Sequence, residues 1–102
     1  MSNNLEYHNE DAVELDSAEG DVVIRDCRTL RAKKGKEITI GGALIVYEEL
    51  SVEGDLRCDR LELKTRDRVV VNGSLYVAKS IDARKGSIEV ENNLEARDIE
   101  FD

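Results

Sequence analysis

The sequence contains no proline and no tryptophan, and its 102 residues include one phenylalanine, three tyrosines and one histidine. Proline lacks the backbone N–H group that a β-ladder requires, so its absence is typical of a chain built mostly of paired strands. Few aromatic side chains are poor material for one large central core. A composition with few aromatic residues favours an elongated fold in which small aliphatic side chains stack in rows.

Motifs for catalysis, cofactors and metals are also missing. His8 is the single histidine, and one histidine cannot form a three-histidine metal site within one chain. Gly41-Gly42 is followed neither by a GK[ST] sequence nor by a helical pattern, and GxGxxG does not occur. We therefore expect no catalytic residues, no metal and no cofactor, and hence a protein that is not an enzyme.

No apolar run approaches the roughly 20 residues of a membrane span, and no basic start followed by an apolar stretch resembles a signal peptide. The default expectation is a soluble, cytoplasmic protein. Its two cysteines, Cys27 and Cys58, are too far apart in sequence for a CxxC motif. We expect two free thiols, with Cys58 acting as a small core residue.

Acidic residues are concentrated at the N-terminus. Residues 1–21 contain seven Asp and Glu residues and no Lys or Arg, whereas residues 22–102 contain 16 acids and 15 bases. We expect residues 1–20 to form an acidic tail, which could act as a partial cap, with one short ordered stretch at Val13–Leu15. Residues 21–102 then form the folded domain, and Val22–Ile24 is its first clear strand.

Pairs of apolar residues separated by one residue recur from Leu30 to Phe101 and fall into four sets of three pairs. The sets begin at residues 30, 50, 69 and 88, so they are 20, 19 and 19 residues apart. Each pair predicts a short strand with two side chains on the same side, and Gly, Asn and Asp between pairs predict turns. The pattern indicates an all-β, three-sided parallel β-solenoid (β-helix) of four full coils plus a partial N-terminal coil. The general crossover rule favours right-handed winding.

The alignment of the sets predicts which residues stack in rows. One row of the first face should contain Leu30, Leu50, Val69 and Ile88, with Ala32 beginning the neighbouring row. None of the 24 predicted inward positions is charged. A shift of one residue would fill the interior with charged side chains, so the alternation strongly specifies the register.

Three phrases of the repeat, Val-Glu-Gly-Asp-Leu (52–56), Val-Asn-Gly-Ser-Leu (71–75) and Val-Glu-Asn-Asn-Leu (90–94), resemble the bactofilins, a family of polymer-forming cytoskeletal proteins. The resemblance covers about residues 30–102. It implies a right-handed, three-sided β-helix flanked by flexible tails. It also implies nucleotide-independent assembly into nonpolar filaments by end-to-end stacking.

The ends of a solenoid present unpaired backbone groups and a slice of apolar core. Only Asp102 follows Phe101 in this sequence, so we expect the last coil to be uncapped. A second copy would cover it, giving a structural scaffold that self-associates end to end. An N-terminal cap would lead to dimers through the C-terminal ends, and an open N-terminal end would lead to filaments. The expected self-association residues are Ile88, Leu94, Ile99 and Phe101.

A basic patch supports a second hypothesis, in which a flat face or this patch docks an acidic partner. That partner could be another protein, and nucleic acid or a membrane surface is left open. The alternative is a solvated edge neutralised by the acidic N-terminal segment. The patch consists of Arg25, Arg28, Arg31, Lys33, Lys34 and Lys36.

Overall fold

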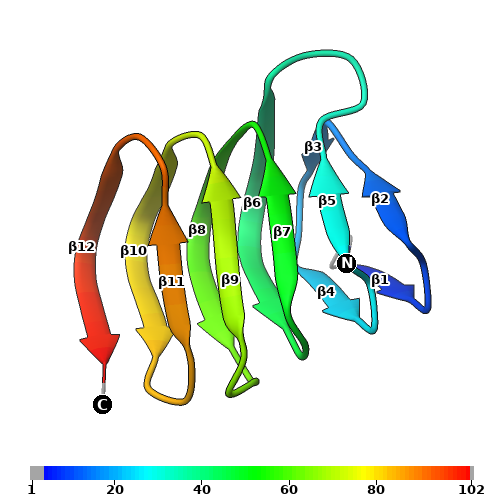
Figure 1. The fold of residues 1–102 in the computed structure, drawn as a ribbon. Coiled ribbons are helices and arrows are strands. Elements are labelled where there is room, and N and C mark those ends of the chain that lie inside the picture. The colour runs from blue at the N-terminus through cyan, green and yellow to red at the C-terminus, as the bar shows by residue number, and fades with distance from the viewer. Residues whose placement is uncertain (1–3, 102) are drawn as a thin grey trace.

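The computed structural model describes residues 4–101, with side chains for residues 4–100. It is an all-β structure in which parallel strands stack along one axis (Figure 1). A five-stranded sheet forms the first face of the solenoid. It comprises β2 (Ala12–Glu14), β5 (Thr29–Arg31), β7 (Leu50–Glu53), β9 (Arg68–Asn72) and β11 (Ser87–Val90).

The other sheet contains seven strands and folds over two further faces. Its strands are β1 (Leu5–His8), β3 (Ser17–Ala18), β4 (Val22–Arg25), β6 (Glu37–Val46), β8 (Asp55–Leu63), β10 (Leu75–Ala83) and β12 (Leu94–Phe101). The four long strands, β6, β8, β10 and β12, each bend at a corner between two faces. The bend appears as register shifts in the strand pairing, between Ile40 and Ala43 and between Val77 and Ser80. The first parts of these strands and β3 form the second face; their second parts, with β1 and β4, form the third.

One strand segment on each face makes one turn, and this confirms the predicted three-sided parallel β-solenoid. Five turns follow one another, namely β2–β3–β4, β5–β6, β7–β8, β9–β10 and β11–β12. Strand β1 adds a single segment before them, on the third face. Figure 1 shows the N-terminal strands at one end of the stack and β11 and β12 at the other.

The turn count differs from the four coils and a partial one expected from the sequence. Strands β1, β2 and β3 all lie within the segment for which we expected an acidic tail, and β2 pairs with β5 while β3 pairs with β6. The repeat is hard to see there because β3 is only two residues long. Its second-face position contributes Ala18 alone instead of an apolar pair.

The rows of the first face also differ from the prediction at one strand. Leu30 pairs with Val52 rather than Leu50, and the row continues through Val71 and Val90. The reason is the loop between β5 and β6, residues 32–36, which is longer than the single residue between β7 and β8. The chain leaves the first face earlier in this turn, so Ala32 lies beyond β5 and is only partly buried.

The interior otherwise follows the predicted alternation. Of the 18 inward positions expected in the first three sets, all except Ala32 are buried. Cys58 is among them, and Cys27 is buried as well. No buried side-chain nitrogen or oxygen in the described part of the chain lacks a hydrogen-bond partner.

The corner between the first and second faces explains the regular glycines. A Cβ atom on Gly73 would lie 2.5 Å from the carbonyl oxygen of Gly54, the equivalent residue of the preceding turn. Gly54 itself has a φ of 104°, which favours glycine. Asp55 Oδ1 accepts a hydrogen bond from the Ser74 backbone N–H (2.8 Å), and Ser74 Oγ accepts one from that of Asn93 (3.4 Å). The corner residues therefore link each turn to the next.

Candidate self-association surface

The C-terminal end of the solenoid is formed by β11 and β12, the last strands of the two sheets. Each pairs on one side only, β11 with β9 and β12 with β10. No strand in residues 4–101 pairs with their outer edges. The backbone groups along these edges are therefore available to another strand, the property that makes edge strands prone to association.

Apolar side chains are exposed along the same edge. Leu94 and Ile99 are 41% and 39% exposed, whereas Leu75 and Ile81, their partners one turn earlier, are 0% exposed. Ile88 of β11 is partly buried. The structure therefore brings the predicted residues Ile88, Leu94 and Ile99 together on one turn. Phe101 is the last residue of β12, but its side chain lies outside the described residues.

Two further residues of this surface were not singled out from the sequence. Val90 of β11 and Ala96 of β12 are also only partly buried and pack against the end of the core. Both belong to the apolar–x–apolar pairs of the fourth set, so the signal was present. Their exposure depends on their being in the last turn.

The N-terminal end is more closed. Val13 of β2 is 2% exposed, and Val22 and Ile24 of β4 are 0% and 1% exposed, although these strands belong to the first turn. Strand β1 pairs with β4 and places Tyr7 against the core. Leu5 is the exception, with 37% of its surface exposed. The two ends of the solenoid therefore differ in how much apolar surface they present.

Acidic side chains surround the open C-terminal end. The described part of the last turn has one base, Arg97, and its acids are Glu89, Glu91, Glu95, Asp98 and Glu100. Any partner that covers this end meets a negatively charged rim, so a second copy approaching through the same end is repelled at low ionic strength.

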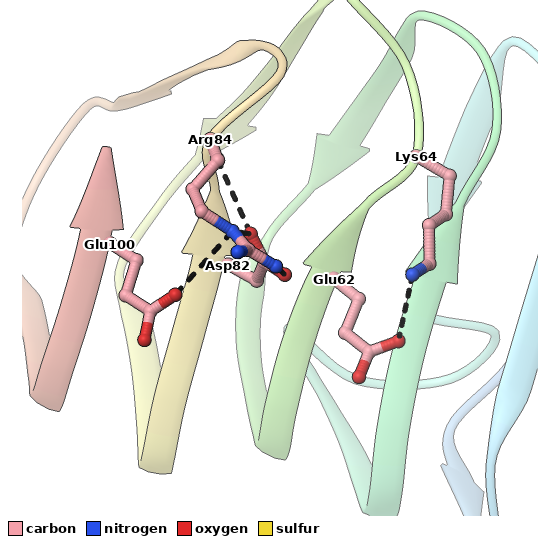
Figure 2. A network of polar contacts seen from close by, with 5 residues as sticks. All are labelled: Glu62, Lys64, Asp82, Arg84 and Glu100. Atoms are coloured by element: carbon pink, nitrogen blue, oxygen red, sulfur yellow. Dashed lines mark hydrogen bonds and ion pairs between the residues drawn. The ribbon is translucent and has the colours of Figure 1, made fainter. Parts of the chain in front are cut away.

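A charged row leads along the third face to this end. Glu62, Asp82 and Glu100 occupy equivalent positions in three successive turns. Figure 2 shows Lys64 beside Glu62, with Arg84 lying between Asp82 and Glu100. The Arg84 guanidinium donates hydrogen bonds to Asp82 and lowers the pKa of that carboxyl. These pairs offset repulsion within the row, and exposed pairs of this kind contribute about 1 kcal/mol or less each to stability.

The residues of the basic patch lie on several elements, from the end of β4 to the loop before β6. Arg25 ends β4 and stacks on the Tyr47 ring, with its Cζ atom 3.9 Å from the ring centroid. Arg31 lies on the first face, where its guanidinium is 3.5 Å from the Glu14 carboxylate. Arg28 lies between these strands, before β5.

The loop that contains the three lysines of the patch is held by an acid of the first turn. The backbone N–H groups of Lys33 and Lys34 donate to Asp16 Oδ1 at 2.8 and 2.9 Å. The N–H of Lys34 makes the largest contribution to lowering the pKa of the Asp16 carboxyl. Lys36 is the last residue of this loop, directly before β6. Glu14 and Asp16 of the N-terminal segment thus contact the Arg31 side chain and the backbone of the lysine loop, respectively.

Other reactive groups lie apart from one another. His8 ends β1, and its Nε2 atom is 3.9 Å from the Glu6 carboxylate. Burial raises the pKa of the Cys58 thiol to about 12. Across residues 4–101, no group of three or more His, Cys, Asp and Glu side chains is arranged to hold a metal ion. No helix in the same residues is long and apolar enough to cross a membrane.

Comparisons with known proteins add no relative. No protein-family model matches the chain, and neither a curated protein nor a solved structure matches it. The open C-terminal turn, with its apolar edge and acidic rim, is therefore the feature on which a functional argument rests.

Proposed function

We propose that this protein is a non-enzymatic structural scaffold, bactofilin-like in its repeat, that self-associates end to end through its open C-terminal turn. The observation that carries the proposal is the exposure of Leu94 and Ile99, at 41% and 39%, on an unpaired strand edge. A second copy of the same solenoid is a suitable partner because it offers both apolar side chains and strand edges.

The expected strength of this contact can be estimated from the exposed surface. Full burial of a Leu or Ile side chain contributes about 1.5–3 kcal/mol. Leu94 and Ile99 have about two fifths of their surface left to bury, so each contributes roughly 1 kcal/mol on association. Backbone hydrogen bonds along the edge add roughly 1 kcal/mol each. These small terms support an association that depends on protein concentration rather than a permanent dimer.

Replacing an end residue by arginine tests the proposal. In Ile99→Arg and Leu94→Arg, a charge at the open end should abolish the concentration-dependent species seen by sedimentation velocity, while the circular dichroism of the fold is retained. Asn92→Arg is the matched control, because Asn92 is an exposed corner residue of the same turn and β12 begins only at Leu94. Equal sedimentation of Ile99→Arg and the control would contradict the proposal.

The acidic rim supplies an independent check. Because added salt screens repulsion between like charges, association should increase when sodium chloride is raised from low to moderate concentration. Negative-stain microscopy of the same samples distinguishes filaments from dimers. A partner-binding role for the basic patch would instead show binding that weakens with salt. The separation of Arg25 from Arg31 and their contacts with Tyr47 and Glu14 give that second hypothesis less support.

A further inference from the structure

We propose that β1 is a displaceable plug: it occupies the place on the third face that residues 98–101 of a second copy would take in a continuous head-to-tail stack. The inference rests on the proposed self-association, since it specifies which arrangement of copies the fold allows. It is carried by the strand count on each face and by the likeness of β1 to the end of β12.

The three faces contain unequal numbers of strand segments, and this prevents continuous head-to-tail stacking. The first and second faces each contain five strand segments, whereas β1 gives the third face six. If β11 of one copy paired with β2 of the next, and the first part of β12 with β3, then residues 98–101 would need the edge of β4. That edge is already paired with β1.

Stacking on top of β1 does not remove the conflict. If residues 98–101 paired with β1 of the next copy, the other two faces would be left one strand short at the junction. Each gap would then be about 4.8 Å wider than a strand pair allows. A continuous head-to-tail junction on all three faces therefore requires β1 to leave β4.

The end of β12 matches β1 in sequence and register. Strand β1 places Leu5-Glu6-Tyr7 against Val22-Val23-Ile24, and β12 places Ile99-Glu100-Phe101 against Ile81-Asp82-Ala83. Both segments read aliphatic, Glu, aromatic. In both, the first and third residues align with inward positions of the third face. Residues 99–101 can therefore replace residues 5–7 on β4 in the same register, with Glu100 opposite Val23.

Strand β1, which precedes the first turn, has no fully buried residue. It pairs through one edge only, Leu5 is 37% exposed, and Tyr7 is partly buried. The neighbouring strand β4 is more buried: Val22 and Ile24 are 0% and 1% exposed while β1 is in place. The edge of β4 therefore needs an apolar occupant, and β1, which pairs with β4 over four residues, currently supplies it.

A pair of engineered cysteines reports the exchange. In a protein carrying Val23→Cys and Glu100→Cys, the two positions become neighbours only when β12 of one copy lies on β4 of another. Adjacent strands bring Cα atoms about 4.8 Å apart, within the roughly 4.4–6.8 Å range of disulfides. Each single-cysteine variant serves as a control for symmetric contacts. The natural Cys27 and Cys58 are buried.

The plug is released by Tyr7→Glu in this background, because the substitution places a charge against the core on β1 alone. Glu6→Gln is the matched control, since Glu6 points away from the core on the same strand. We expect the Tyr7→Glu protein to form at least fivefold more intermolecular 23–100 disulfide under mild oxidation, as a ladder on non-reducing gels. The Glu6→Gln protein should behave as the parent does.

Deletion of residues 1–9 gives a second route to release without a buried charge, and circular dichroism checks the fold of both variants. A folded release variant with no increase in 23–100 disulfide overturns the inference. Loss of the fold in both variants also overturns it, because β1 would then be integral rather than displaceable. Concentration-dependent association without this disulfide would leave the proposed function standing. Monomers in every variant would refute both.

Discussion

Ile81 and Ile99 occupy the same row of the third face in successive turns, and they allow one substitution to be compared in two environments. Ile81 is 0% exposed, and Ile99 is 39% exposed. In Ile81→Ala the lost burial and the cavity left behind should lower the free energy of unfolding by about 3–4 kcal/mol.

Ile99→Ala should lower the free energy of unfolding by less than Ile81→Ala does. Removing three carbons costs roughly 2.4 kcal/mol when they are fully buried. With 39% of the side chain already exposed and the site open to water, we expect a loss of about 1.5 kcal/mol in the monomer. The ratio of the two effects measures how open the last turn is.

Urea unfolding followed by circular dichroism at low and high protein concentration measures both values. If a second copy covers the end, the loss for Ile99→Ala should grow with protein concentration, because binding adds to the stability of the folded state. The loss for Ile81→Ala should stay the same. Equal losses for both variants at low concentration would refute the reasoning, since Ile99 would then have to be as enclosed as Ile81.

Three further predictions follow from local contacts. Gly73→Ala should lower the free energy of unfolding by about 1–3 kcal/mol, because its Cβ atom would lie 2.5 Å from the Gly54 carbonyl oxygen. Gly35→Ala should be nearly neutral, because a Cβ atom there would have no neighbour within 4 Å. Thermal unfolding of the two variants compares the effects. The lowered pKa of Asp16 means that its carboxylate stabilises the fold above the usual value of 3.8 and that this contribution is lost as pH falls through the folded-state pKa. Asp16→Asn should therefore be less stable than wild type at neutral pH, and an acid titration should show the difference disappearing; a constant difference would contradict it. Because the pKa of the Cys58 thiol is raised to about 12, a thiol-specific chromophoric reagent should label it slowly at neutral pH in the folded state and quickly in denaturant.

The sequence by itself was enough to determine the architecture. Alternation of apolar and polar residues has a period of two in strands, and a slip of one residue would bury charges. The pairs at Leu56/Cys58, Leu61/Leu63 and Leu75/Val77 therefore fixed which side chains face inward, and all six are buried. The recurring Gly54 and Gly73 likewise marked a corner where successive turns approach closely.

Local pattern was less informative where strands are short or loops differ in length. The two-residue β3 hid the first turn, and the long loop after Arg31 moved Leu30 into register with Val52. Both depend on pairing between residues 17–22 positions apart. Such pairing is decided by the neighbouring turn and not by the segment itself.

Only the tertiary structure decided how the two ends differ. Leu5-Glu6-Tyr7 and Ile99-Glu100-Phe101 look alike in the sequence, yet the first adds a sixth segment to the third face at the N-terminal end and the second completes the fifth turn at the other end. The sequence specifies the inward face of each strand because that choice is local and repeated. Whether an edge is covered depends on how many segments each face receives. That number follows from the path of the whole chain around the solenoid.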